Sequence, residues 1–339
     1  RFTDIDGNEY IDMFAGIAVN ALGHNHPKLV KAIQDQAEKL IHISSIYYNE
    51  PALIYAKKLV ELTSFDRIFY ANSGAEANEG AIKLAVKYTG KSEVISTVES
   101  FHGRTVMTLA ATGHEHYHEP FKAILPKGFI NVPYNDIEAI KEAITENTAA
   151  IIVEPIQGEG GVNVPDAGYL KEIEKICHEK DIIFIVDEVQ TGFGRCGTLF
   201  AHELFDVKPD IMTMAKGIGG GVPMGGILAT EKVAGAFVPG DHGTTFGGGP
   251  LVCAAANAVL DTIEEDNLLN NVNEVGDYFI EELKKLDKEI IADVRGKGLM
   301  VGLELTEPGA EYVDKLREKG FLINCTADKV LRFVPPLII

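Results

Sequence analysis

The sequence predicts an α/β protein: a mostly parallel sheet covered by helices, followed by a smaller α+β domain. Strand-like and helix-like segments alternate through the middle of the 339 residues, which is the pattern of a parallel sheet with helices on both faces. The apolar runs are short, as at residues 182–186, and this length suits buried strands rather than a bilayer span. From about Pro250 onward the alternation gives way to two successive helices and a strand pair.

The elements of the first domain follow from local residue spacing. Runs of strand-forming residues predict strands at 67–70, 93–98, 149–153, 184–189 and 211–215. Apolar residues at helical spacing predict helices at 75–88 and 168–180.

The two ends of the chain are expected to lie together. Helices are predicted at 250–264 and 268–286, and strands at 290–295 and 299–305, joined by a turn at 296–298. A strand pair and a helix at 28–40 begin the chain, and we expect them to pack beside the C-terminal domain. The predicted organisation is an N-terminal segment at 1–42, a large domain at 43–265 and a small domain at 266–339.

Composition narrows the class of protein. Hydrophobic residues make up 46% and charged residues 24%, with a net charge of −19, so no basic excess is present to bind nucleic acid or an anionic membrane. Cys177, Cys196, Cys253 and Cys325 form no CxxC pair, which favours reduced thiols in a cytoplasmic protein. No signal peptide is visible. Because the chain begins inside a strand pattern and ends on an apolar run, we expect the natural protein to be longer, with the small domain truncated.

A first candidate binding segment opens the helix at 75–88. Ser73 and Glu76 have the spacing of a capping box, and Gly74 allows a ligand to approach the backbone. The free N–H groups at the start of a helix bind anions, so Ser73, Gly74 and Ala75 form a candidate phosphate site. An ordinary capped helix is the competing interpretation.

Two strand ends carry further candidates. Asp187 and Glu188 end an apolar strand at the sheet edge where α/β proteins bind ligands. A carboxylate there could keep a pyridine nitrogen protonated, bind a metal or cap a loop. Lys216 follows the strand at 211–215 and precedes several glycines, which favours a ligand contact over a solvated charge. Between these segments, Phe101 could stack on a flat ring and Arg104 could pair with a carboxylate, or the arginine could simply lie on a surface loop.

Together these segments resemble the class III, or ornithine-type, aminotransferases of pyridoxal-phosphate (PLP) fold type I. The resemblance runs from residues 7–10 to 335–337 and includes the segments at 23–27, 154–161 and 244–248. It implies a large domain with a seven-stranded, mostly parallel sheet and a smaller α+β domain. It also implies PLP as cofactor, no metal, and a homodimer with shared active sites.

The resemblance assigns roles to individual residues. The lysine matching Lys216 binds PLP covalently, and the aspartate matching Asp187 holds the pyridine nitrogen. The other expected cofactor contacts are Ser73, Gly74, Ala75, Phe101, Glu188, Val189, Gln190 and, from the partner subunit, Thr245. Ala75 departs from the family, where a threonine is common, so a hydroxyl contact would be lost there and a backbone contact kept.

Substrate contacts are also implied by the resemblance. Arg104 matches a residue that binds a substrate carboxylate, Arg332 matches one that binds the α-carboxylate of glutamate, and Glu159 matches a carboxylate that masks this arginine. Thr244 is a further expected substrate contact.

Within the class, residues 324–336 look most like acetylornithine aminotransferases of arginine biosynthesis. The implied reaction transfers the distal amino group of N-acetylornithine to 2-oxoglutarate, giving N-acetylglutamate semialdehyde and glutamate. Ornithine enzymes carry a tyrosine near Ile17, and its absence favours an acylated donor. Succinyl-diaminopimelate, carrier-linked lysine, ornithine and 4-aminobutyrate remain open as donors. An aminomutase and a catalytically inactive binding module with this fold also remain open.

Two motifs are typical of other kinds of site, one for a dinucleotide and one for a metal ion. Residues 192–197 match the GxGxxG dinucleotide-binding pattern, but the acidic residue expected about 20 positions later is missing. His114, His116 and His118 alternate and could hold a metal on a strand. We expect this segment to be a solvated loop instead, and His24 and His26 to be structural residues at the start of a helix.

Overall fold

The computed structural model describes residues 1–339, and its largest feature is a seven-stranded sheet. The strands lie in the order β3 (Arg67–Ala71), β9 (Gly225–Ala229), β8 (Ile211–Met214), β7 (Ile183–Asp187), β6 (Thr148–Val153), β4 (Glu93–Thr97) and β5 (Phe129–Val132). β9 is antiparallel to both of its neighbours, and the other pairs are parallel. The predicted α/β class is therefore confirmed, with strand ends within about two residues of the expected positions.

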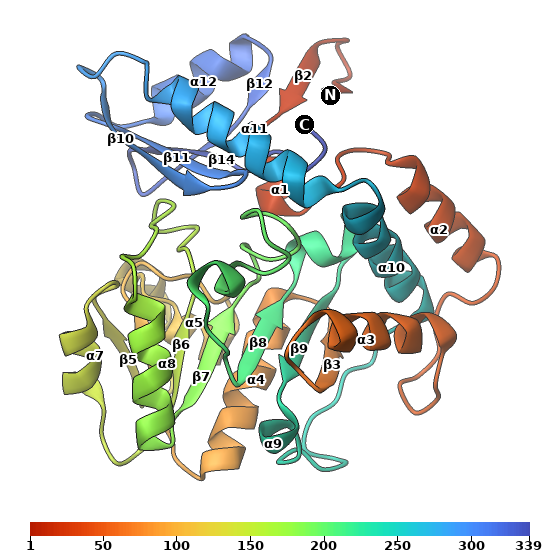
Figure 1. Ribbon diagram of the computed structural model, residues 1–339, viewed down its shortest axis with the longest axis vertical. Helices are drawn as coiled ribbons and strands as arrows, with labels where there is room; N and C mark the ends of the chain where they lie inside the picture. The colour runs from red at the N-terminus through yellow and green to blue at the C-terminus, as the bar shows by residue number, and fades with distance from the viewer.

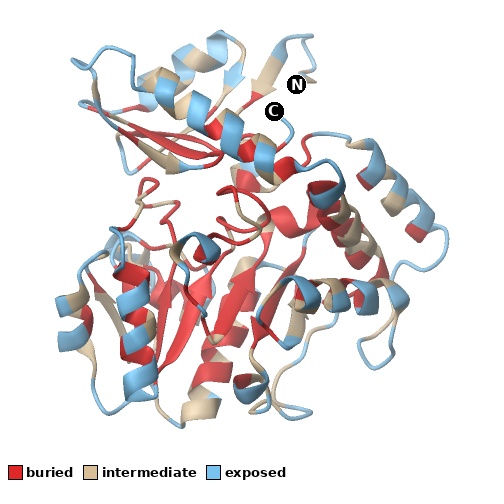
Figure 2. Cartoon of the chain, viewed as in Figure 1, coloured by how far each residue is buried: buried red, intermediate tan, exposed pale blue.

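Helices cover both faces of this sheet because its central strands are apolar on both sides. β6 and β7 are buried along their whole length. Ile152 and Ile185 pack with residues of α4 (Gly74–Thr89) on one face, whereas Ile151 and Phe184 pack with residues of α8 (Tyr169–Lys180) on the other. Figures 1 and 2 show this buried sheet between its helices. This arrangement leaves the carboxyl ends of the parallel strands at one edge.

A smaller antiparallel sheet lies beyond that edge (Figure 1). Its order is β10 (Ile291–Lys297), β11 (Met300–Leu305), β14 (Val330–Phe333) and β13 (Asn324–Thr326). α11 (Leu268–Leu283) and α12 (Ala310–Glu318) pack against it.

The N-terminal residues divide between two places. β1 (Phe2–Thr3) pairs with β2 (Glu9–Asp12), and β2 runs parallel to β12 (Phe321–Leu322), so this strand pair joins the C-terminal part of the chain. α2 (Pro27–Ala37) packs instead against α10 (Pro250–Glu265). The N-terminal segment does not pack as one body beside the small domain, and the boundaries at 42/43 and 265/266 remain a prediction.

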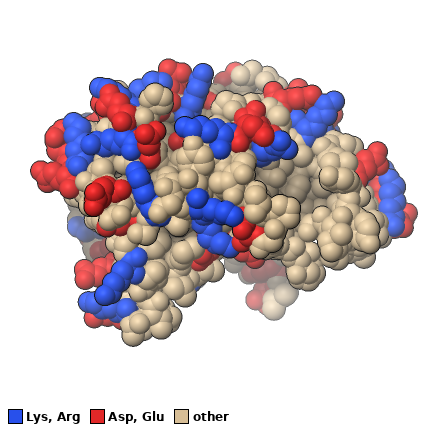
Figure 3. All heavy atoms as spheres, turned by 90° about the horizontal axis from the view of Figure 1, so that it is seen from below, with Lys and Arg blue, Asp and Glu red and all other residues tan.

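The remaining elements are short or peripheral. The α-helices are α1 (Ala15–Ala18), α3 (Glu50–Leu62), α5 (Val106–Ala111), α6 (Glu115–His118), α7 (Ile137–Ala143) and α9 (Glu231–Ala234), and the 3₁₀ turns are η1 (Glu119–Phe121), η2 (Ala201–Phe205) and η3 (Lys216–Gly219). None of the helices has the length and apolar character that a membrane crossing requires. Acidic and basic side chains are interspersed on the face shown in Figure 3.

An unusual turn follows β2. All four residues of α1 have positive φ angles, with Ala15 at 49° and Ile17 at 62°, although a β-branched residue rarely adopts this region. The Asp12 carboxylate accepts hydrogen bonds from the N–H groups of Phe14 and Ala15 at 3.0 and 2.7 Å. Its other oxygen lies 2.7 Å from Nε2 of His24. Asp12 therefore stabilises a strained segment of backbone.

Candidate active site

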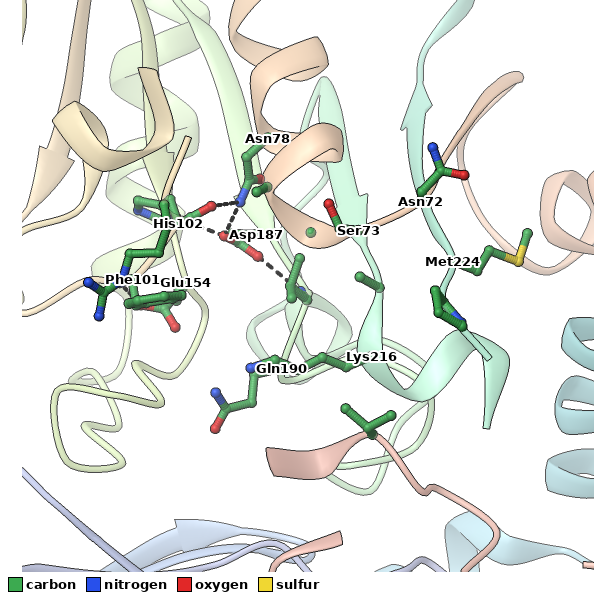
Figure 4. Close-up of a pocket in the computed structure, with 18 of the residues that line it drawn as sticks. Asn72, Ser73, Asn78, Phe101, His102, Glu154, Asp187, Gln190, Lys216 and Met224 are labelled. Atoms are coloured by element: carbon green, nitrogen blue, oxygen red, sulfur yellow. Dashed lines mark hydrogen bonds and ion pairs between the residues drawn. The ribbon is translucent and has the colours of Figure 1, made fainter. Parts of the chain in front are cut away.

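A cavity of about 430 Å³ opens at the carboxyl ends of β7 and β8. Asp187 ends β7, and Lys216 begins the turn after β8, so the two strands bring these residues together (Figure 4). The start of α4 and residues 101–104 form other parts of the wall. Ligands in α/β proteins bind at this edge.

Lys216 supplies an amine to this cavity. It begins η3 with a φ angle of 45°, between Ala215 and the glycines at 217 and 219–221. Burial lowers the pKa of the Lys216 amine, because removal from water disfavours its charged form. A neutral amine is the nucleophilic form.

Asp187 is fixed from three directions. Its exposed fraction is 2%, and one oxygen lies 2.7 Å from both Nδ2 of Asn78 and Nδ1 of His102. The other oxygen accepts a hydrogen bond from the N–H of Val189 at 2.9 Å. Thr213 donates in turn to Asn78 at 2.7 Å. The carboxylate is thereby held in one orientation at the cavity wall.

Sequence reasoning missed the supporting roles of Asn78 and His102. Both stand inside segments that were singled out: Asn78 lies one helical turn after Gly74, and His102 is next to Phe101. Helical spacing places Asn78 on the same face of α4 as Gly74. No local pattern indicates that His102, in a loop, pairs with Asp187.

The start of α4 lies at the cavity as predicted. Ser73 precedes the helix and accepts a hydrogen bond from the N–H of Glu76 at 3.2 Å. The Glu76 carboxylate accepts from the N–H of Asn72 at 2.9 Å, one residue before the position that a capping box uses. Ser73, Gly74 and Ala75 all line the cavity, so the positive end of the helix is directed toward a bound anion.

Glu188 does not face the cavity, although Asp187, Val189 and Gln190 all do. Its side chain is fully buried and accepts hydrogen bonds from the N–H groups of Ala201 and His202 at 3.0 and 2.7 Å. It also contacts the hydroxyl of Thr191. Glu188 follows the last residue of β7, and its carboxylate anchors the start of η2 instead of lining the cavity.

Glu159 and Arg332 form an ion pair with 2.7 Å between Oε1 and Nη1. Arg332 is fully buried, and Gln190 and Asn324 accept from its Nη1 and Nε at 3.0 and 3.2 Å. Its Nη2 is buried with no hydrogen-bond partner. Burial alone raises the pKa of Glu159, but the adjacent Arg332 outweighs this and holds the pKa below its usual value. Nη2 therefore keeps unused hydrogen-bonding capacity, although neither Arg332 nor Glu159 lines the cavity around Lys216.

Arg104 is held in a different way. It is exposed and forms no ion pair, and its guanidinium carbon lies 5.4 Å from the ring centre of Phe101 and 3.6 Å from that of Tyr117. Phe101 and Arg104 both line the cavity. A stacked guanidinium keeps its N–H edges free for a carboxylate.

Glu154 is a further cavity residue that was not assigned a role from sequence. It accepts hydrogen bonds from the N–H groups of Phe101 and Gly158 at 3.0 and 3.2 Å. Burial raises the pKa of Glu154 to about 7, against the opposing effect of nearby His102.

Thr244 and Thr245 lie outside the cavity of their own chain. The Thr244 hydroxyl accepts a hydrogen bond from Nδ2 of Asn72 at 3.1 Å, whereas Thr245 is exposed. Thr244 therefore touches the edge of the site through Asn72, and Thr245 is free to contact another molecule.

The residues present fit PLP. They include an amine of lowered pKa, a fixed and buried carboxylate, an aromatic ring and the start of a long helix on one cavity wall. These groups match the aldehyde, pyridine nitrogen, ring face and phosphate of PLP.

Comparison with known proteins identifies the family. The family model "Aminotransferase class-III" matches residues 1–339. The chain belongs to the class III aminotransferases. As a member, it is a PLP-dependent enzyme, and the dinucleotide-binding interpretation of residues 192–197 is excluded for it.

Individual relatives agree with this assignment. The chain is 56% identical to the acetylornithine aminotransferase of Methanocaldococcus jannaschii and 54% identical to that of Methanothermobacter thermautotrophicus, each over 99% of this chain and 86% of the relative. The ornithine aminotransferase structure from Toxoplasma gondii ME49 aligns with a TM-score of 0.96 at 36% identity, over 99% of this chain and 84% of that one. The acetylornithine aminotransferase structure from Elizabethkingia anophelis aligns with a TM-score of 0.87, also at 36% identity, over 99% and 86% of the two chains.

The two motifs that pointed elsewhere have structural roles in this aminotransferase. Residues 192–197 open no helix, and Arg195 between those glycines is buried and donates to the carbonyls of Leu299 and Pro335 at 2.9 and 2.5 Å. The histidine segment was predicted to be a loop, but His116 and His118 lie in α6 and His114 immediately precedes it. It is not part of any group of three or more side chains able to hold a metal ion. Nε2 of His118 lies within 2.8 Å of two backbone carbonyls, which fixes α6 against α5.

Proposed function

We propose that this enzyme transfers the distal amino group of N-acetylornithine to 2-oxoglutarate, giving N-acetylglutamate semialdehyde and glutamate in arginine biosynthesis. The observation that carries the proposal is the identity of 46–56% to several acetylornithine aminotransferases over nearly the whole chain. The paired Glu159 and Arg332 support it, because the enzyme must accept a diacid in one half-reaction and an amine donor with one carboxylate in the other.

The residues of the cavity have separate chemical roles. When bound, PLP supplies the carbonyl group that accepts the amine and the ring that withdraws electrons from the substrate. Lys216 would hold the cofactor covalently until the amine of the substrate displaces it, and its freed Nζ would then move the proton at the substrate carbon. Asp187, oriented by His102 and Asn78, keeps the pyridine nitrogen protonated. The start of α4 would bind the phosphate, and Phe101 would pack against the ring.

The two arginines receive carboxylates. Arg104 is free to bind the carboxylate that both substrates share. Arg332 binds the second carboxylate of glutamate or 2-oxoglutarate once Glu159 has moved away. With N-acetylornithine, Glu159 returns to Arg332, so that the buried cation is never left without a partner.

Ornithine is the second candidate donor, because the Toxoplasma gondii ornithine aminotransferase has the higher TM-score of the two structures compared. Ile17 argues against it, since ornithine enzymes carry a tyrosine near this position. Succinyl-diaminopimelate, carrier-linked lysine and 4-aminobutyrate are further donors used within the class.

A homodimer with shared sites is part of the proposal. Thr245 is exposed, and so are large apolar side chains near it: Phe246 follows it in the chain and Tyr48 lines a groove together with Thr244, with exposed fractions of 64% and 90%. Large exposed apolar side chains near a site are characteristic of interfaces. A second copy covering this surface would place its Thr245 at the cofactor phosphate. Four free cysteines favour a cytoplasmic location.

A donor screen tests the function. Purified enzyme with PLP and 2-oxoglutarate is offered N-acetylornithine, ornithine, 4-aminobutyrate or succinyl-diaminopimelate, and glutamate is measured. N-acetylornithine should give the highest kcat/KM, and a tenfold preference for another donor would overturn the substrate assignment. Borohydride should fix PLP on Lys216 in peptide mapping, and Lys216→Ala should abolish turnover. Label on a different lysine would overturn the cofactor assignment.

A further inference from the structure

Tyr117 lies at the centre of a cluster beside the cavity. Its ring centre is 3.6 Å from the Arg104 guanidinium carbon, 6.4 Å from the Phe101 ring centre and 3.8 Å from that of His116. The rings of Phe101 and Tyr117 are nearly perpendicular, at 88°. Tyr117 thus touches the arginine, the expected ring-stacking residue and a neighbour on its own helix.

The helix that carries Tyr117 is fixed in place. α6 comprises only Glu115–His118, yet Nε2 of His118 lies 2.8 and 2.7 Å from the carbonyls of Leu109 and Thr112. Because carbonyls only accept hydrogen bonds, this nitrogen carries the proton and donates. The Tyr117 ring is therefore presented from a short segment anchored to α5.

The two arginines expected to bind substrate carboxylates are held in contrasting ways, and only Arg104 lines the cavity. Arg332 is paired with Glu159, so an incoming carboxylate must replace an existing partner. Arg104 forms no ion pair and rests on aromatic rings. A cation over a ring face is attracted by the ring quadrupole, while the N–H groups in the guanidinium plane stay available to a carboxylate. Stacking therefore orients Arg104 without competing for its ligand.

We propose that Tyr117 is a positioning residue for substrate recognition: its ring holds Arg104 in the orientation that binds a substrate carboxylate. The proposal rests on the proposed function for the identity of that substrate. The contact between Tyr117 and Arg104 is independent of the proposed function, because any carboxylate that binds Arg104 would depend on Tyr117 in the same way.

The direct measurement is binding of glutarate, a dicarboxylate with no reactive carbonyl or amine, to the PLP-loaded enzyme by calorimetry. Tyr117→Leu and Tyr117→Gln remove the ring, and both should weaken glutarate binding by about three- to tenfold. Tyr117→Phe keeps the ring and should bind as the wild type does. Glu115→Gln, on the same helix with an exposed side chain, is the matched control and should change affinity less than twofold.

A double-mutant cycle shows whether Tyr117 acts through Arg104. In an Arg104→Ala background, Tyr117→Leu should have no further effect on glutarate binding. In turnover, Tyr117→Leu should raise KM for 2-oxoglutarate by the same factor with kcat within about twofold, and the visible spectrum of bound PLP should not change. The proposal would be overturned if Tyr117→Leu weakened glutarate binding as much in the Arg104→Ala background as in the wild type. It would also be overturned if Tyr117→Phe weakened binding as much as Tyr117→Leu. If the wild-type enzyme binds glutarate but does not turn over N-acetylornithine, the proposed function is wrong and the proposed role of Tyr117 is unaffected.

Discussion

At the scale of single residues, Glu154 is a carboxyl group that burial keeps partly protonated near neutral pH. Its folded-state pKa of about 7 lies above the ordinary value of 4.5. Between these values the folded protein binds the proton more tightly than the unfolded chain, so the stability gained from it is present at low pH and is lost as pH rises. His102 and Asp187 face this group and contribute opposing effects.

Glu154→Gln should therefore flatten the dependence of stability on pH. The wild-type holoenzyme should lose on the order of 3 kcal/mol from this group between pH 4.5 and 8, and the variant, which cannot titrate, should not. Denaturant unfolding at a series of pH values measures this. Glu146→Gln, at an exposed carboxyl on the loop before β6, should retain the wild-type profile. Parallel profiles for the wild type and Glu154→Gln would show that Glu154 is not the titrating group.

Residue patterns predicted the side chains that line the cavity better than they predicted the side chains that support them. Lys216, Asp187 and Ser73 were found from strand ends and a helix start, where local geometry dictates the direction of a side chain. Glu188 was expected at the cofactor, but its carboxylate accepts hydrogen bonds from the start of η2 and does not line the cavity. His102 was missed, since a loop has no period and its partner is 85 positions away in the chain.

At the scale of elements, the left-handed turn α1 shows where prediction from spacing fails. Ala15, Ile17 and Ala18 are not residues that favour positive φ angles, so the sequence gives no local indication of the turn. The central strands, by contrast, were predicted to within two residues, because short continuous apolar runs between polar turns leave few alternatives. The ends of α2 and α11 came earlier than predicted because periodicity does not mark where a helix stops.

Asp12→Ala should destabilise this turn. It leaves two N–H groups without their acceptor and removes the His24 partner, at a cost of about 2–3 kcal/mol. Because Val19, directly after the turn, lines the cavity, KM for the amine donor should rise as well. Thermal unfolding and steady-state kinetics measure both effects. Asp6→Ala, at an exposed position in the preceding turn, is the control and should change neither the unfolding temperature nor KM. If Asp12→Ala also changes neither, the turn does not depend on the Asp12 carboxylate.

At the scale of the whole molecule, a shared site predicts complementation between two inactive chains. Lys216→Ala lacks the covalent link to PLP, and Thr245→Ala would lack the phosphate contact supplied across the dimer. In a mixed dimer one site has both defects and the other has neither, so up to about half of the activity of a normal dimer should return in each hybrid. Activity after denaturation and refolding of the mixture measures this. Absence of rescue, with hybrid dimers demonstrated by mass spectrometry, would place Thr245 outside the partner's site.

Contacts between distant parts of the chain were the feature that residue spacing predicted least. The pairing of Glu159 with Arg332 was expected only from the resemblance to class III aminotransferases, and the structure shows it as an ion pair. Glu159 lies in the loop after β6, and Arg332 lies in β14 of the small sheet. Thr326, in the neighbouring strand β13, also bonds the Glu159 carbonyl oxygen. In the function we propose, Glu159 frees Arg332 for a diacid by moving its side chain, because its backbone is bonded to the small sheet.

Glu159→Ala should consequently affect the two half-reactions in opposite ways. With N-acetylornithine bound, Arg332 would keep only Gln190 and Asn324 as partners, which accept hydrogen bonds but carry no charge. The cost should be about 1–3 kcal/mol of transition-state stabilisation. With glutamate, the substrate carboxylate no longer competes with Glu159, so this half-reaction should be unchanged or faster. Glu159→Gln, which retains the shape and loses the charge, should show the same asymmetry. Stopped-flow spectra of the holoenzyme record each half-reaction separately, and equal losses in both would show that Glu159 supports the site without distinguishing its substrates.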